Sequence, residues 1–302
     1  MMTKIEIVEV GVRDGLQNEA QVFSTENKLE LVGRLLDAGV KRLEVASFVH
    51  PKLVPQMADA EAVVAGLPAR EDVTYIGLVL NDRGLTRALA TGGIDEIGAV
   101  AVASDSFGEK NQGKTSRESV TVSKALIKRA KAEGLRAQVT ISASFGCPFE
   151  GLTPIQKVLD IIKELAEAEP FEIAIADTIG VAVPNHVEEL FSKAKELAPG
   201  IPLRGHFHNT RNTAVASCWA AFQAGASVLD ASIGGLGGCP FAPRATGNVA
   251  TEEVAFLFER SGIETGLNLD KLIDTNKWLE DKMSKTLPSM VSRAGPLTNG
   301  KK

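Results

Sequence analysis

The sequence has few of the features that mark secreted, membrane-bound or nucleic-acid-binding proteins. Its three cysteines, Cys147, Cys218 and Cys239, are odd in number, widely spaced and never arranged as CxxC. This argues against a disulfide framework and a cysteine-built zinc site, and it favours a reducing cytoplasm. The longest apolar run, residues 97–103, is far too short to span a bilayer, and the N-terminal residues contain no apolar signal core. We therefore expect a cytoplasmic protein that is neither secreted nor bound to a membrane.

The sequence also has no excess of basic over acidic side chains. The chain of 302 residues has 33 basic and 38 acidic side chains, which gives a net charge of −5. This balance argues against general nucleic-acid binding, although it leaves room for a local basic pocket. Hydrophobic residues make up 44% and charged residues 24%, as is ordinary for a globular chain.

Short β-branched runs alternate with longer segments whose apolar residues recur every three or four positions, a pattern typical of strand–helix units. We predict strands at residues 5–10, 42–46, 74–79, 96–101, 136–142, 172–176, 203–207 and 228–232. We predict helices at residues 26–38, 116–133, 154–168 and 186–197. Eight such units at this length predict an α/β fold, a closed (β/α)8 TIM barrel, with its active site at the carboxyl ends of the strands.

We expect one catalytic barrel domain over residues 1–302, because no linker or low-complexity tract divides the chain. The barrel would occupy about residues 1–265. A short C-terminal helical extension would follow over about residues 266–302, with a helix near 269–285 and then a polar tail.

The first predicted strand leads into a dense polar cluster, Arg13-Asp14-Gly15-Leu16-Gln17-Asn18. One interpretation is a surface turn with a local ion pair. The other is a carboxylate ligand beside a cation that binds a developing oxyanion.

The seventh strand ends in Gly205-His206-Phe207-His208. Because strand side chains alternate between faces, His206 and His208 point the same way. Two imidazoles at a barrel mouth suit a divalent metal ion, and the alternative is a pair of polar rim residues without metal.

The eighth unit supplies the glycine-rich segment 234–238, followed by Cys239. Such a loop is mobile or tightly turned, and by itself it is weak evidence of function. A thiol on a closing loop can donate a proton or act as a nucleophile. Asn248, a little further on, can offer an amide oxygen to a hard cation.

Three more polar residues follow predicted strands: Glu44, Asp177 and Thr178. At each position a structural hydrogen bond is as good an interpretation as a role in catalysis.

Taken together, these segments resemble 3-hydroxy-3-methylglutaryl-CoA (HMG-CoA) lyase of the bacterial type, within the metallolyase barrel group named for its Asp-Arg-Glu signature. The likeness covers about residues 5–272 and is carried by segments 9–19, 47–49, 54–57, 146–151, 177–180 and 235–240. The resemblance implies a lyase that cleaves such a thioester to acetyl-CoA and a 3-oxo acid. It also implies a homodimer, an acyl-CoA partner, and a place in leucine or terpenoid breakdown.

By the same resemblance, specific residues acquire roles. A divalent cation, Mg²⁺ or Mn²⁺, would be held by Asp14, His206, His208 and Asn248. Arg13 would stabilise the enolate, Cys239 would protonate it, His206 or else Asp177 would act as the base, and Glu44 would orient Arg13 or a ligand. Substrate contacts would come from Arg13, Gln17, Ser47, Asn111 and Thr178.

The chain also departs from the family pattern. Asn209 stands where the mitochondrial-type enzymes carry Asp, and Thr140 and Ala174 stand where Tyr and Ser are expected. The two smaller side chains leave room for a larger 3-substituent. The alternatives are therefore the same chemistry on another CoA ester, such as a longer 3-substituted hydroxyglutaryl, citramalyl or methylmalyl ester, and a non-catalytic barrel that binds a metabolite.

Overall fold

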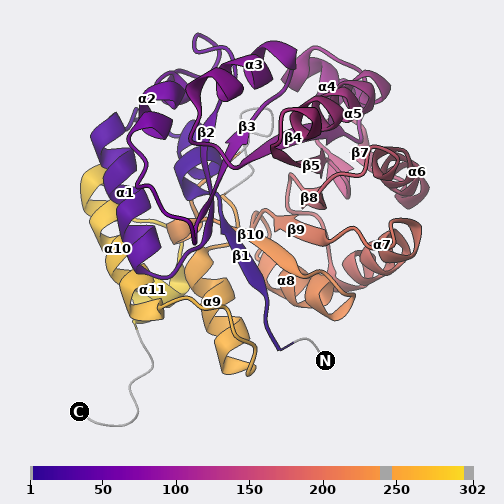
Figure 1. Ribbon diagram of the computed structural model, residues 1–302. Helices are drawn as coiled ribbons and strands as arrows, with labels where there is room; N and C mark the ends of the chain where they lie inside the picture. Colours follow the sequence, from indigo (N-terminus) through magenta and orange to yellow (C-terminus); the bar gives the residue numbers. More distant parts are fainter. Residues whose placement is uncertain (1–2, 239–246, 296–302) are drawn as a thin grey trace.

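Eight parallel strands close into a barrel in the computed structural model, which describes residues 3–238 and 247–295 (Figure 1). Around the barrel the strands pair in the order β1-β10-β9-β8-β5-β4-β3-β2. Sequential strand–helix units are therefore neighbours, and the last strand returns to pair with the first. The predicted (β/α)8 barrel is confirmed.

The strand predictions agree with the structure to within one residue at each end. The barrel strands are β1 (Glu6–Glu9), β2 (Arg42–Ser47), β3 (Thr74–Leu78), β4 (Glu96–Val102), β5 (Arg136–Ser142), β8 (Glu172–Asp177), β9 (Leu203–Phe207) and β10 (Val228–Ala231). Two further short strands, β6 (Gly146–Cys147) and β7 (Gly151–Leu152), form an antiparallel hairpin between β5 and the next helix, which the sequence analysis missed.

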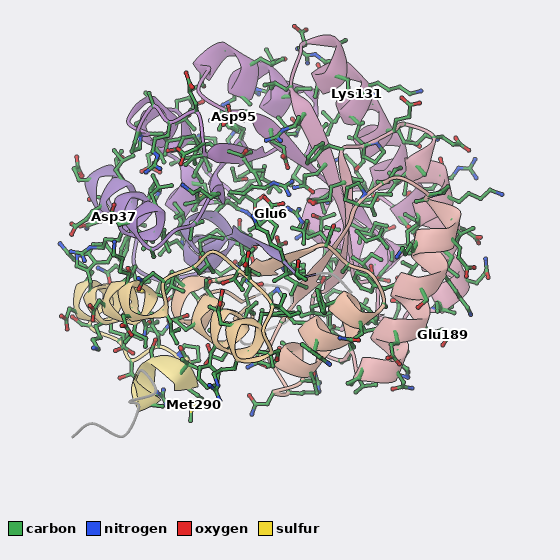
Figure 2. The ribbon with its side chains drawn as sticks, turned by 60° about the horizontal axis from the view of Figure 1, so that its bottom comes forward. Glu6, Asp37, Asp95, Lys131, Glu189 and Met290 are labelled. Atoms are coloured by element: carbon green, nitrogen blue, oxygen red, sulfur yellow. The ribbon has the colours of Figure 1, made fainter. Side chains whose placement is uncertain are left out.

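Helices cover the outside of the barrel (Figure 1). They are α1 (Thr25–Asp37), α2 (Ala60–Ala65), α3 (Asp82–Thr91), α4 (Asp105–Gln112), α5 (Ser116–Ala132), α6 (Ile155–Ala166), α7 (Pro184–Leu197), α8 (Ala214–Gln223), α9 (Thr251–Arg260), α10 (Leu269–Met283) and α11 (Met290–Ala294). Figure 2 shows Asp37, Lys131 and Glu189 on this outer ring, whereas Glu6 lies near the barrel axis. None of the helices in the described part of the chain is long and apolar enough to cross a membrane.

The C-terminal extension is helical, as predicted, but its last part is not simply a polar tail. A short helix, α11, follows α10, and Glu253 of α9 accepts hydrogen bonds from the Met290 amide (2.6 Å) and the Ser289 hydroxyl (3.1 Å). A five-residue helix has too few positions to show an apolar period, so the sequence carried little sign of it.

Two apolar cores lie on the two faces of the strands. On β1, Ile7 packs into the large core between the barrel and its helices. Val8, the next residue, belongs with Val10, Ile76 and Val228 to a separate small cluster. This alternation follows from the two-residue period of a strand and marks Val8 as pointing to the barrel interior.

Candidate active site at the mouth of the barrel

The segment after β1 is a tight π-helical turn, Gly11–Gly15, that carries Arg13 and Asp14. Glycine is required at both ends, because a Cβ on Gly11 or Gly15 would lie 2.6 Å from a Glu9 oxygen or 2.8 Å from the Ser232 hydroxyl. The Glu9 carboxylate fixes the turn by accepting hydrogen bonds from the amides of Gly11 (2.7 Å) and Ile233 (2.9 Å). Burial raises the pKa of Glu9 to about 7.

Arg13 lies between two buried carboxylates. Its Nε donates to Glu44 Oε2 at 2.8 Å, its Nη2 also contacts Glu44, and its Nη1 donates to Asp14 Oδ1 at 2.6 Å. Burial alone would lower the pKa of Arg13, but the charges of Glu44 and Asp14 raise it, so the guanidinium stays positive. Glu44 therefore contacts Arg13 directly, as the sequence analysis anticipated.

Asp14 lies close to the two histidines of β9. One ligand atom each from Asp14, His206 and His208 fall within 4.8 Å of one another, and all three residues are buried. Burial would raise the pKa of Asp14, but the positive charges of Arg13, His206 and His208 lower it to about 2. A carboxylate held ionised beside two imidazoles is a donor set suited to a divalent cation.

Asn248, in the described segment that begins at residue 247, completes this group. Its Nδ2 donates to Asp14 Oδ2 at 2.7 Å, and it is only 2% exposed. Its Oδ1 is buried and has no hydrogen-bond partner in the described part of the chain. A buried acceptor without a donor is costly in water-free surroundings, and a metal ion at this position would satisfy it. The four residues predicted as metal ligands therefore lie together and fit a divalent cation.

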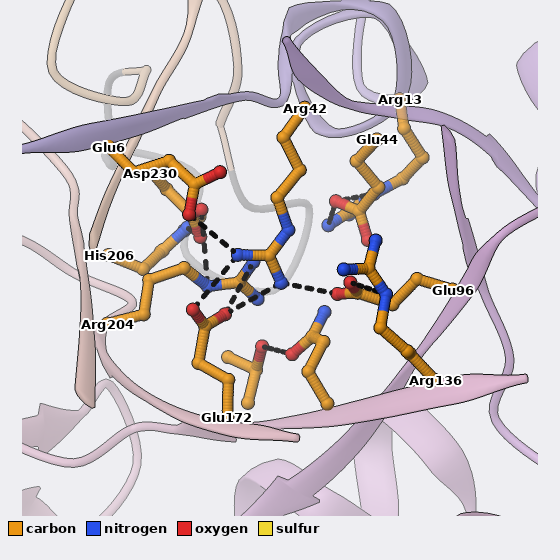
Figure 3. A network of polar contacts seen from close by, with 12 residues as sticks. Glu6, Arg13, Arg42, Glu44, Glu96, Arg136, Glu172, Arg204, His206 and Asp230 are labelled. Atoms are coloured by element: carbon orange, nitrogen blue, oxygen red, sulfur yellow. Dashed lines mark hydrogen bonds and ion pairs between the residues drawn. The ribbon is translucent and has the colours of Figure 1, made fainter. Parts of the chain in front are cut away.

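His206 has a further partner that the sequence analysis missed. Its Nδ1 lies 2.9 Å from Oδ2 of Asp230, a buried residue of β10 (Figure 3). Burial would raise the pKa of Asp230, but the Arg204 charge and the hydrogen bond with His206 lower it. The signal in the sequence was a single acid within an apolar strand, Val228-Leu229-Asp230-Ala231.

The glycine-rich segment is tightly turned where the structure describes it. Gly234 has φ +66°, and its amide donates to the Glu252 carboxylate at 3.0 Å. Glu252 also accepts a hydrogen bond from the Ser292 hydroxyl of α11 at 2.8 Å, and burial raises its pKa to about 8. The C-terminal extension therefore supports the base of this loop. Cys239 lies outside the described residues.

Asp177 binds the loop that follows β8, and Thr178 binds the segment that follows β5. Asp177 accepts from the amides of Val181 (3.0 Å) and Ala182 (2.8 Å), and burial raises its pKa. The Thr178 hydroxyl accepts from the Ala143 amide at 2.9 Å. Both contacts are the structural hydrogen bonds that the sequence analysis kept open for these positions.

The other predicted substrate contacts lie at different distances from the cation ligands. Gln17 is beside them, since its Nε2 donates to Asp14 Oδ1 at 3.3 Å. Ser47 is fully buried at the end of β2, with no hydrogen-bond partner for its hydroxyl among the described residues. Asn111 is exposed on α4, and no contact in the described residues joins it to the cluster.

Comparison with known proteins agrees with this fold. The HMGL-like family model matches residues 4–279. Hydroxymethylglutaryl-CoA lyase YngG of Bacillus subtilis is 41% identical over 95% of both chains, and an (R)-citramalyl-CoA lyase of Chloroflexus aurantiacus is 39% identical over 98% of this chain and 96% of its own. An HMG-CoA lyase of Acinetobacter baumannii, solved with coenzyme A and 3-methylmalate, superposes with a TM-score of 0.94 at 34% identity and covers 99% of this chain and 97% of its own.

The fold and the cluster at its mouth thus define a barrel enzyme of the carbon–carbon lyase type. The chain belongs to the HMGL-like family. As an enzyme it is hydroxymethylglutaryl-CoA lyase-like.

Proposed function

We propose that this protein cleaves 3-hydroxy-3-methylglutaryl-CoA to acetyl-CoA and acetoacetate in a reaction that requires a divalent cation, Mg²⁺ or Mn²⁺. The observation that carries the proposal is the convergence of Asp14, His206 and His208 within 4.8 Å, with Arg13 donating to Asp14 at 2.6 Å. Asp14, His206, His208 and Asn248 would hold the cation. A bound cation would supply Lewis-acid polarisation of the substrate's tertiary hydroxyl and a carboxylate oxygen.

Arg13 is the group that would stabilise the negative charge formed on the enolate oxygen in the reaction. When the C2–C3 bond breaks in the retro-Claisen direction, its electron pair moves into the thioester carbonyl and gives the acetyl-CoA enolate. Glu44 fixes the guanidinium through Nε, so that its charge is already in place when the enolate oxygen becomes negative. One such donor contributes about 3 kcal/mol to the transition state. Cys239 would then return a proton to the enolate carbon.

A base must first remove the hydroxyl proton, and the two candidates are His206 and Asp177. His206 has one ring nitrogen directed at Asp230, so only Nε2 remains for the cation or for a proton. Asp177 has a raised pKa, which suits a base near neutral pH, but its oxygens also hold the following loop. An Asp177→Asn variant separates them: unchanged kcat assigns the base to His206, and a large loss assigns it to Asp177. Thermal unfolding of the same variant checks whether the loop has loosened.

Gln17, Ser47, Asn111 and Thr178 are the proposed further substrate contacts. CoA was bound to the Acinetobacter baumannii relative, which supports an acyl-CoA substrate here. We also propose a homodimer in the cytoplasm that takes part in leucine degradation, on the resemblance to the family.

A second candidate is the same bond cleavage in a citramalyl-type CoA ester. The observation that favours it is the 39% identity with a protein named (R)-citramalyl-CoA lyase. Thr140 and Ala174, where larger side chains were expected, lie opposite each other on β5 and β8. They would leave room for an ester with a larger 3-substituent and do not by themselves favour the citramalyl group, which is shorter than the hydroxymethylglutaryl group.

A comparison of two substrates in separate assays tests the proposal. Purified protein, freed of metal and then supplied with Mg²⁺, is given 3-hydroxy-3-methylglutaryl-CoA or citramalyl-CoA, and acetyl-CoA release is followed by mass spectrometry. We expect a higher kcat/KM for the first ester. A higher value for citramalyl-CoA would move the substrate to the second candidate, and no release from either would contradict the proposed chemistry. The Arg13→Gln protein serves as the matched negative control.

A further inference from the structure

The contact between His206 and Asp230 determines which ring nitrogen of His206 carries the proton. Strands β9 and β10 are parallel neighbours, with Leu229 opposite Gly205, so Asp230 lies beside His206. A neutral imidazole has one N–H and one lone pair. A carboxylate 2.9 Å from Nδ1 holds the proton there and leaves the Nε2 lone pair for another ligand.

Asp230 itself forms an ion pair with Arg204 on the side of the barrel floor. Arg204, two residues before His206 on the same strand, places Nε 3.4 Å from Asp230 Oδ1 (Figure 3). Its Nη1 lies 3.3 Å from Glu172 Oε1, and Glu172 in turn accepts from Arg42 at 2.9 Å. Arg204, Asp230 and Glu172 are each less than a tenth exposed. The charge of Asp230 is therefore compensated by Arg204. Its Oδ2 contacts His206, and its Oδ1 faces Arg204 in an ion pair without a hydrogen bond among the described residues.

We propose that Asp230, fixed by Arg204, is a positioning residue that sets the tautomer and ring orientation of His206 for cation binding. This inference rests on the cation site of the proposed function and adds two residues, Asp230 and Arg204, that are not among its proposed ligands. A carboxylate behind a ligating histidine raises the basicity of the ligand and removes its rotational freedom, and loss of such a partner typically weakens metal binding by about 10–100-fold.

Mn²⁺ affinity of the metal-free protein, measured by electron paramagnetic resonance, tests this without any turnover. Asp230→Asn keeps the size of the side chain and removes its charge, and Asp230→Ala covers the case in which the new amide oxygen takes over the contact. We expect both to bind Mn²⁺ at least about tenfold more weakly than the wild type. Glu172→Gln is the matched control, because Glu172 touches Arg204 but not His206. It should keep wild-type affinity to within about threefold, because the Asp230 partner of His206 is unchanged.

The tautomer is read directly on the wild-type protein, so that the test does not depend on a variant that folds. The chain has four histidines, and ¹⁵N imidazole spectra of the metal-free protein, assigned with a His206→Gln sample, resolve their neutral forms. We expect the proton of neutral His206 on Nδ1. A proton on Nε2, or folded Asp230 variants with Mn²⁺ affinity unchanged, would overturn the inference.

The outcomes also separate this inference from the proposed function. If the wild type binds Mn²⁺ through His206 but cleaves neither CoA ester, the proposed reaction fails and the role of Asp230 stands. If the wild type binds no Mn²⁺, the cation site fails, and the positioning role fails with it.

Discussion

The barrel holds two buried clusters of charge, one at its mouth and one at its floor, and they are built differently. At the floor, Arg42 lies against Glu96 (2.5 Å) and Glu172 (2.9 Å), and Arg204 lies against Glu172 and Asp230 (Figure 3). Each of these charges has an opposite charge beside it. At the mouth, the ligand atoms of Asp14, His206 and His208 instead converge on one another, and Asn248 Oδ1 has no partner among the described residues.

Burial and charge alone therefore do not identify a functional site. The floor cluster pairs each charge with an opposite charge, although Arg42 Nε, Glu96 Oε2, Arg204 Nε and Asp230 Oδ1 make no hydrogen bond among the described residues. The mouth cluster leaves donor atoms directed at a common point, which is the arrangement a bound cation requires. One strand joins them, because Arg204, His206 and His208 follow the two-residue period of β9 from floor to mouth.

We expect the greatest loss of activity from a substitution at the mouth, Arg13→Gln. The variant removes the positive charge that would stabilise the enolate, so we expect kcat to fall about 10³-fold. Mn²⁺ should still bind, because Arg13 is not a proposed ligand; as the partner of Asp14, its loss should weaken binding by at most about 10–100-fold. Steady-state kinetics measures the loss, with the half-exposed pair variant Arg34→Gln as the control. Turnover retained to within about tenfold would remove Arg13 from its role.

At the floor, Arg42→Met should change stability and not chemistry. The variant leaves Glu96 and Glu172 buried without this counter-charge, and breaking a buried pair costs about 3 kcal/mol. Urea unfolding measures the free energy. Arg70→Met, which breaks an exposed pair with Asp72, should cost less than about 1 kcal/mol. Lost turnover with unchanged stability would show that the floor is not merely structural.

The third prediction concerns how the contribution of Asp14, at the mouth, to the free energy of unfolding changes with pH. The pKa of Asp14 falls from 3.8 to about 2 on folding, so its ionised form stabilises the folded state. This stabilisation, about 2 kcal/mol, is complete above the unfolded value and is lost as the pH falls towards 2. The difference in unfolding free energy between wild type and Asp14→Asn should therefore shrink by about half between pH 6 and pH 3. Urea unfolding at the two pH values measures it, and a constant difference would contradict the assigned pKa.

A further test concerns the support of the mouth by the C-terminal extension, where the contrast between two variants is about 1 kcal/mol. Gly234 has φ +66°, and a Cβ there would collide with Asn276 and Leu287. Gly234→Ala should cost about 2 kcal/mol in unfolding free energy. Gly262 has a similar φ, +74°, but nothing within 4 Å of its Cβ, so Gly262→Ala isolates the backbone cost of about 1 kcal/mol. Equal losses for the two variants would mean that the contact with the extension contributes nothing.

The sequence predicted the mouth better than the floor, for a physical reason. Strand ends carry their functional residues in short motifs, and the barrel rule alone brings Arg13, Asp14, His206 and His208 to one rim. Arg42, Glu96 and Glu172 lie within strands far apart in the chain, and their contacts depend on the radius and register of the closed barrel. Asp230 could be located only once β10 was known to pair with β9, beside His206. The hairpin β6–β7 and helix α11 were missed because each is too short to carry a period.

The proposed reaction requires one divalent cation at the mouth for cleavage of the substrate. The direct measurement is to remove all metal, add Mn²⁺ in steps, and record bound Mn²⁺ and the rate of acetyl-CoA release from 3-hydroxy-3-methylglutaryl-CoA in the same samples. The rate should rise in proportion to bound Mn²⁺ and reach its maximum at about one ion per chain, the stoichiometry of a single metal site. A full rate in the metal-free protein, or a rate unrelated to bound Mn²⁺, would contradict the account.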